Sequence, residues 1–108
     1  MKSSRKIEDA WFVTRYCEGH KSAMAVLVKR WHNKFCKQAY SYANDFDIAK
    51  DIAQDAWITI LKNVHTLEHP DKFGAWGLSI VTKKSIDWYR KNKRTLDKKQ
   101  EILSLIHI

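Results

Sequence analysis

The stretch that decides the fold is residues 73–94, FGAWGLSIVTKKSIDWYRKNKR, which begins as an aromatic amphipathic helix and ends as a cationic one. Residues 83–99 contain eight Lys and Arg side chains against only Asp87 and Asp97, so this segment carries +6 of the chain's formal charge of +8. Charge concentrated in this way indicates a polyanionic partner, most simply a nucleic acid.

Two tryptophans lie on the same segment as the charge. Flat rings such as those of Trp76 and Trp88 can stack on unpaired bases while neighbouring cations hold phosphates. The alternative for such a helix is a solvated basic face over a buried aromatic core. The rest of the sequence is needed to decide between these two interpretations.

Composition places the whole chain in the all-α class. A length of 108 residues gives room for one domain, and 44% hydrophobic residues with five Trp suffice for its core. Three Gly and one Pro leave few positions for turns, which favours long helices over short strands. The sequence therefore predicts a four-helix, single-domain bundle.

Cap residues and apolar periodicity divide the chain into four expected helices. The first covers about residues 7–17, and the second covers about residues 22–44. Asp45 is the expected N-cap of a third helix, whose apolar positions recur as far as Val64. Pro70 is the expected first residue of the fourth helix, which continues into the basic segment.

The end of the chain is expected to lie outside this domain. We expect residues 1–94 to form the helical domain and residues 95–108 to be the start of a linker or a truncated tail. The apolar residues of this tail are Ile102, Leu103, Leu105, Ile106 and Ile108. Such a tail either packs against the bundle, mediates self-association or belongs to an interrupted linker.

The sequence indicates no catalytic, metal or cofactor chemistry. Cys17 and Cys36 lack the spacing of a zinc site and are expected to be reduced thiols. His65 and His69 are four residues apart but lack a second ligand pair, so we expect no metal. Without a Gly-rich phosphate loop or a nucleophile elbow, neither a cofactor nor an enzymatic activity is expected. The absence of a signal peptide or long apolar run predicts a cytoplasmic protein without a membrane partner.

The expected third helix carries the opposite charge from the fourth. Asp47, Asp51 and Asp55 recur every four residues with Gln54 close by, so they share one face of the helix. Like charges at this spacing cost about 0.2–0.5 kcal/mol per pair, and the helix dipole compensates only those in the first turn. The face is either a solubilising surface or a docking site for a second, basic partner.

Residues 49–55, AKDIAQD, and residues 73–81, FGAWGLSIV, form two motifs in this order. Together they resemble region 2 of the sigma-70 family, specifically of the extracytoplasmic-function (ECF) type. The family pattern Ala-Glu-Asp-Leu-x-Gln-Glu is met by residues 49–55, AKDIAQD. The pattern Phe-x-Ala-Trp-Leu-x-x-Ile-Ala is met by residues 73–81, FGAWGLSIV, followed by Asp87 and the cationic residues 90–94. The resemblance covers roughly residues 7–94 and implies the all-α fold of sigma region 2.

The resemblance implies a polymerase contact on the third helix. In this family the helix docks on the clamp helices of the largest subunit of core RNA polymerase. The expected contacts here are Asp47, Asp51, Gln54, Asp55 and Ile58. The polymerase would be the basic partner that an acidic docking face requires.

The resemblance also implies that the chain binds the non-template strand of promoter DNA and helps to melt the minus ten element. The loop between the third and fourth helices would capture a flipped base, with expected contacts His65, Thr66, Glu68, His69 and Lys72. The fourth helix would face the upstream edge of the melted region, where Trp76 would be an aromatic wedge. The expected duplex contacts are Ser79, Lys83 and Lys84. The expected phosphate contacts are Arg90, Lys91, Lys93 and Arg94.

Two other functions stay open on the sequence alone. One is a generic basic helical DNA-binding domain, which would leave the acidic face without a role. The other is a protein-interaction module of an anti-sigma-type regulatory system, whose basic segment would meet an acidic protein. If the chain is a sigma factor, an anti-sigma factor is a further candidate partner.

Overall fold

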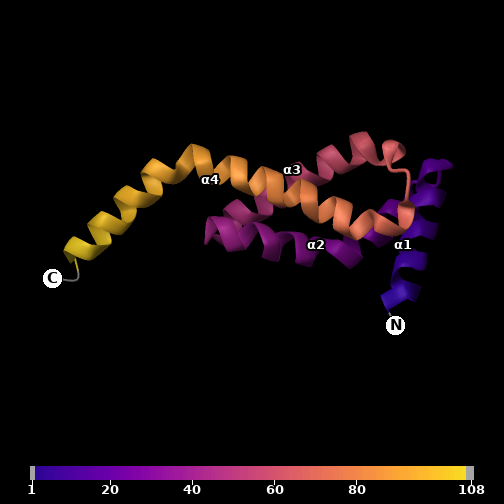
Figure 1. Cartoon of the computed structure of the whole chain (residues 1–108), viewed down its shortest axis with the longest axis horizontal. Coiled ribbons are helices and arrows are strands. Elements are labelled where there is room, and N and C mark those ends of the chain that lie inside the picture. Colours follow the sequence, from indigo (N-terminus) through magenta and orange to yellow (C-terminus); the bar gives the residue numbers. More distant parts are fainter. Residues whose placement is uncertain (1, 107–108) are drawn as a thin grey trace.

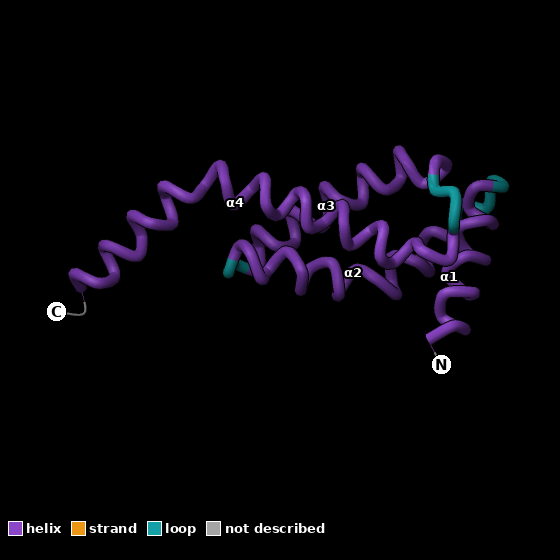
Figure 2. The backbone as a smooth tube through the Cα atoms, viewed as in Figure 1, coloured by secondary structure: helices purple, strands orange, loops and turns teal. Residues whose placement is uncertain are grey.

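The computed structural model describes residues 2–106 and confirms the predicted all-α class (Figure 1). Its α-helices are α1 (Lys2–Cys17), α2 (Ser22–Ala43), α3 (Phe46–Asn63) and α4 (Phe73–Ile106). The 3-10 helices η1 (Val64–Thr66) and η2 (Pro70–Lys72) lie between α3 and α4. Figure 1 shows α1 lying across one end of the bundle, while the last part of α4 projects beyond the opposite end. The loops, teal in Figure 2, are short.

The junction between α2 and α3 follows the predicted cap. Asn44 ends α2 in the left-handed conformation with φ of 53°, which Asn tolerates better than most residues. The Asp45 side chain then accepts hydrogen bonds from the backbone N–H groups of Asp47, at 2.9 Å, and Ile48, at 3.1 Å. Asp45 is therefore confirmed as the N-cap of α3, and Asp47 lies in its first turn.

The start of α4 differs from the prediction. Pro70 does not begin the α-helix but a separate 3-10 turn, and α4 begins at Phe73. The turn is closed by a hydrogen bond of 2.9 Å from the Lys72 N–H to the His69 carbonyl, a tighter pairing than that of an α-helix. The fixed φ of proline suits this turn as well as it suits a first helical residue.

The core forms where α2, α3 and α4 meet. Its largest fully buried side chains include Leu27 and Phe35 of α2, Ile60 of α3, and Phe73 and Val81 of α4. These residues belong to apolar repeats of three or four positions, so each helix turns one stripe toward its neighbours. Burying such side chains stabilises the bundle by about 1.5–3 kcal/mol each.

Two glycines of α4 allow the rings of α2 to approach its backbone. A Cβ atom added at Gly74 would overlap the Trp31 ring, and one added at Gly77 would lie 2.6 Å from Cζ of Phe35. Glycine costs a helix about 1 kcal/mol relative to alanine. The close packing of Trp31 and Phe35 against α4 explains why glycine occupies both positions despite this cost.

A charged network ties α1 to α2. Asp9 is only 2% exposed, and its Oδ1 lies 2.9 Å from Nε of Arg30 in an ion pair without hydrogen-bond geometry. Trp31 Nε1 donates a hydrogen bond to Asp9 Oδ2 at 3.2 Å. Arg30 also donates to Glu8 at 2.7 Å, and this hydrogen bond raises the pKa of the guanidinium. The buried carboxylate is thus paired, as its burial requires.

The same network explains why α1 is longer than predicted. The helix begins at Lys2 instead of near residue 7. Arg30 Nη2 donates to the backbone carbonyl of Arg5 at 3.3 Å, which holds an exposed turn of α1 against α2. The local apolar pattern gives no sign of this tertiary contact. The pattern alone therefore placed the start of α1 too late.

The last turns of α4 continue past residue 94 without a break. Ile102 and Leu105 are 56% and 69% exposed, and Figure 1 shows this end of the helix away from the bundle. The described part of the tail therefore does not pack against the bundle, whereas Ile108 lies outside the described residues. The division of the chain after residue 94 stays a prediction.

Candidate nucleic-acid interface

The acidic face predicted for α3 is exposed. Ile58 is 53% exposed although it is apolar, and it lies one helical turn beyond Gln54. All five residues predicted to contact the polymerase are exposed side chains of this helix: Asp47, Asp51, Gln54, Asp55 and Ile58. The helix buries its opposite stripe, which includes Ala49, Ala53 and Ile60, against α2 and α4. The face is thus free to meet a partner.

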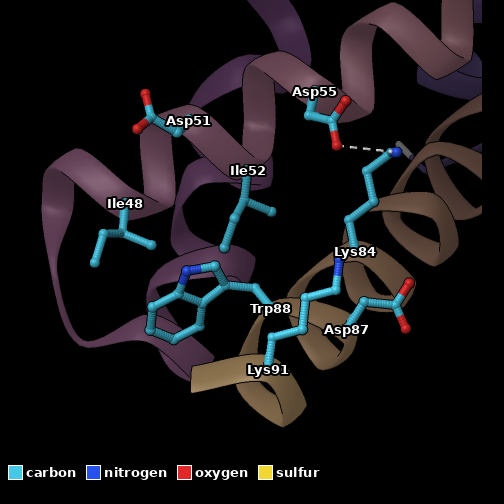
Figure 3. A pocket seen from close by; sticks show the side chains of 8 residues that line it. All are labelled: Ile48, Asp51, Ile52, Asp55, Lys84, Asp87, Trp88 and Lys91. Carbon is cyan, nitrogen blue, oxygen red and sulfur yellow. Dashed lines mark hydrogen bonds and ion pairs between the residues drawn. The ribbon is translucent and has the colours of Figure 1, made fainter. Parts of the chain in front are cut away.

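A groove of about 480 Å³ separates this face from α4 (Figure 3). Its apolar lining consists of Ile48, Ile52 and Trp88. Its charged lining consists of Asp51, Asp55, Lys84, Asp87 and Lys91. The acidic face of α3 and part of the basic surface of α4 therefore line the same groove.

One ion pair crosses the groove. Lys84 Nζ lies 3.1 Å from Asp55 Oδ2, and the two side chains are 25% and 62% exposed (Figure 3). The sequence assigned Lys84 to DNA and Asp55 to the polymerase, but in the free chain they bind each other. An exposed pair of this kind contributes about 0–1 kcal/mol. Either side chain can exchange its partner for an intermolecular one at little cost.

The cations of α4 fall on two different faces. Consecutive residues of a helix point about 100° apart, and Lys83 and Arg90 line a surface hollow, whereas Lys84 and Lys91 line the groove beside α3. The hollow of about 630 Å³ is lined by Ala75, Leu78, Ser79, Thr82, Lys83, Ile86, Asp87 and Arg90. The predicted duplex contacts Ser79 and Lys83 therefore lie together, and Lys84 does not lie with them.

A residue of α2 contacts α4 at the hollow. Gln38 Nε2 of α2 donates to Thr82 Oγ1 of α4 at 3.1 Å, so the two helices form one surface at this level. The Ser79 hydroxyl donates to the Trp76 carbonyl at 2.6 Å, which leaves its lone pairs for a further donor. Thr82 was missed in the sequence, although its spacing of three from Ser79 places it on the same face.

The loop between α3 and α4 is held by α1. His65 of η1 stacks on Tyr16 of α1, with ring centroids 6.1 Å apart and an interplanar angle of 27°. The Thr66 hydroxyl donates to the Asn63 carbonyl at 2.6 Å. The five predicted loop contacts are all exposed: His65, Thr66, Glu68, His69 and Lys72. Tyr16 was missed because only the tertiary fold brings α1 to this loop.

The predicted wedge, Trp76, is half-buried. Its ring packs against the edge of the core, with its centroid 6.1 Å from that of Phe73. The remaining predicted phosphate contacts, Lys93 and Arg94, are exposed beyond the hollow. One face of the indole thus contributes to stability while its exposed part stays accessible to a base.

The two cysteines are free thiols of α1 and α2. Burial raises the pKa of both, and for Cys36 the positive charge of Lys50 acts in the opposite direction. Within residues 2–106, no three His, Cys, Asp or Glu side chains are grouped to hold a metal ion. No helix in the described part of the chain has the length and apolarity needed to cross a membrane.

The comparisons with known proteins show to which family the chain is similar. The profile of the sigma-70 region 2 family matches residues 27–95, which include α3, the loop and α4 as far as residue 95. The chain is 28% identical over 74 residues to RNA polymerase sigma factor SigV of Bacillus subtilis (strain 168), a match that covers 68% of this chain and 45% of that protein. No solved structure shows a significant match to the chain.

Two further proteins of Bacillus subtilis (strain 168) are similar. ECF RNA polymerase sigma factor SigW is 32% identical over 76 residues, covering 70% of this chain and 41% of that protein. ECF RNA polymerase sigma factor SigX is 28% identical over 68 residues, covering 63% of this chain and 35% of that protein. The chain thus spans less than half the length of these relatives. Because the family profile covers well over half of the chain, the protein belongs to the sigma-70 region 2 family, as its two motifs predicted.

Proposed function

We propose that this chain acts as region 2 of an ECF-type sigma factor. It docks on core RNA polymerase and binds the non-template strand of the promoter minus ten element, which it helps to melt. The observation that carries the proposal is the division of charge between adjoining helices. The exposed face of α3 is acidic, whereas α4 places Lys83 and Arg90 in a hollow on another side and also exposes Lys93 and Arg94.

The two charge signs fit two different partners. A polyanion is repelled by Asp47, Asp51 and Asp55, so the acidic face suits a protein with a basic docking surface, such as the clamp helices of the polymerase. The cations on the hollow side of α4 suit phosphates. A generic DNA-binding domain would use only the second surface, so the sigma role accounts for more of the molecule.

The site suits binding and strand separation. Once α3 is docked, the α4 cations hold the backbone, and the exposed part of Trp76 supports a base that has lost its stacking partner. The loop offers His65, Thr66 and Glu68 as exposed polar groups for a flipped base. Favourable contacts with single-stranded DNA shift the equilibrium from closed to open promoter. This role requires no bond chemistry in the chain.

A reconstituted melting assay tests the proposal. The chain is mixed with core RNA polymerase and promoter fragments that carry 2-aminopurine within candidate minus ten elements. We expect the core enzyme to bind the chain and 2-aminopurine fluorescence to rise only when both proteins are present. Binding to DNA that is equally strong without core polymerase, and without melting, would instead support the generic DNA-binding alternative. Failure to bind core polymerase at all contradicts the sigma role.

A further inference from the structure

A second basic site lies between α1 and α2, outside all the predicted contacts. A pocket of about 190 Å³ is lined by Arg5, Arg30, Trp31 and Lys34. Three of its four lining side chains are cations, and the fourth is an indole. Two carboxylates, those of Glu8 and Asp9, are paired with Arg30. Three cations against two carboxylates leave the cluster with a net positive charge.

Arg30 organises this pocket by holding both carboxylates. Its guanidinium is engaged by both carboxylates and by the Arg5 carbonyl. In the part of the chain that the structure describes, the Arg5 guanidinium and the Lys34 ammonium have no carboxylate within ion-pair distance. Both residues are exposed. Their charges are therefore available to an anion.

Trp31 forms a rigid wall of the pocket. Its Nε1 is bonded to buried Asp9, and the ring contacts the backbone of α4 at Gly74. Lys34 Nζ lies 4.7 Å from the ring centroid in a cation–π contact. This contact holds the lysine over the pocket in the free chain. The site is thus largely preorganised, which lowers the entropic cost of binding.

The pocket adjoins the proposed DNA surface. Gly74, which the Trp31 ring contacts, lies two residues after the end of the loop turn η2. One turn beyond Lys34 on α2, Gln38 bonds to Thr82 in the hollow of α4. A strand that follows α4 from its basic end toward the loop therefore reaches Arg5 and Lys34 next.

We propose that Arg5 and Lys34 bind a backbone phosphate of the non-template strand just downstream of the minus ten element. This inference rests on the proposed function, in which α4 faces the upstream edge of the melted region, so the strand runs downstream from α4 toward the loop. The volume of about 190 Å³ lies below the range of about 300–1,000 Å³ of pockets that enclose whole small molecules. It therefore suits a phosphate group better than a base. The arginine fork can bind two phosphate oxygens, and the lysine supplies a point charge.

Single-stranded oligonucleotides with one neutral methylphosphonate linkage at a time locate the contact. Affinity is measured by fluorescence anisotropy with saturating core polymerase. We expect the wild-type protein to lose affinity when one particular downstream linkage is neutral. The variant Arg5→Gln/Lys34→Gln should bind the unmodified strand about 5-fold more weakly at 0.1 M salt, the factor for one lost phosphate contact on a single strand. It should be insensitive to the same methylphosphonate.

The matched control is Lys21→Gln/Lys29→Gln, which removes the same charge from exposed residues that do not line the pocket. We expect it to keep the wild-type sensitivity to methylphosphonates and most of the affinity. The inference is overturned if the control weakens binding equally, since only total charge would then matter. The inference is also overturned if methylphosphonates at upstream linkages weaken binding of the wild-type protein but those at downstream linkages do not. If no methylphosphonate at any linkage weakens binding of the wild-type protein, the proposed function itself is contradicted.

Discussion

Asp55 of α3 and Lys84 of α4 neutralise each other across the groove at 3.1 Å, although the sequence assigns them to different partners. The pair marks the boundary between the acidic face and the basic helix. Because both side chains retain contact with solvent, the pair is weak, and each residue can be altered without unfolding the chain. This makes the two proposed surfaces separable by mutation.

The first prediction separates polymerase docking from the ion pair. Reversing the charge in Asp51→Lys/Asp55→Lys should abolish binding to core polymerase, because two repulsive contacts replace two attractive ones. Lys84→Gln breaks the same ion pair but leaves the acidic face intact, so it should bind the core normally. Pull-down and anisotropy measure the binding, and circular dichroism verifies the helical content. Normal core binding by the double reversal would contradict the docking assignment.

The second prediction concerns base recognition by the loop. Replacing residues 65–69 with a Gly/Ser segment should flatten the base preference at one promoter position more than it lowers overall affinity, because flipped bases are recognised by local pockets. Affinity is compared across oligonucleotides that vary at single positions. Tyr16→Leu removes the ring beneath His65 and should reduce the same preference in part. Equal weakening on every sequence would mean that the loop is only a connector.

The third prediction uses the two faces of α4. Neutralising Lys83 and Arg90, which line the hollow, should reduce the slope of log affinity against log salt by about 1.4, from about 0.7 per phosphate contact on a single strand. Neutralising Lys84 and Lys91, which line the groove beside α3, removes the same charge from the same helix. This control should leave the slope almost unchanged when core polymerase is saturating. Equal changes in both variants would mean that DNA does not distinguish the faces.

The fourth prediction tests the close approach of α2 and α4. Gly77→Ala should lower the free energy of unfolding by about 1–3 kcal/mol, because the new methyl group overpacks against Phe35. Alanine would raise stability if helix propensity decided the outcome. The control Ser79→Ala changes an exposed position nearby and should alter stability by less than about 0.5 kcal/mol. Urea denaturation measures both.

A smaller ring should rescue the overpacked helix. Phe35→Leu destabilises the wild type, but in the Gly77→Ala background it removes the atoms that clash with the new methyl group. The two substitutions should therefore be less destabilising together than the sum of their separate effects. Additive losses would show that Gly77 is needed for another reason.

Much of the fold follows from local signals in the sequence. The side chain of Asp45 caps α3 through its own backbone neighbours, and such a contact can be predicted from residue type and spacing. The start of α1 could not be predicted, because it depends on Arg30, which is far away in sequence. Gly77 is another example: its role depends on the Phe35 ring of a different helix.

The candidate site shows the same limit. Helical spacing correctly placed the acidic residues on one exposed face of α3. It did not reveal that Lys84 faces α3 while Lys83 faces away, because the direction depends on how α4 is rotated in the bundle. Tyr16 joins the loop only through the tertiary fold. Helical spacing therefore predicts which residues share a face of one helix. The packing of the helices decides which faces lie next to each other.

The last prediction concerns Trp76, whose ring is half-buried and shared between core and solvent. Trp76→Ala should weaken binding to open or single-stranded DNA by about 1–3 kcal/mol, the usual contribution of a stacked base. The salt slope should hardly change, because stacking releases no counterions. The substitution also removes contacts with Phe73, so stability must be measured in parallel. Trp76→Leu keeps much of the apolar volume without the aromatic face and is the matched variant. If it folds stably and binds DNA like the wild type, the ring is a core residue and the wedge role is wrong.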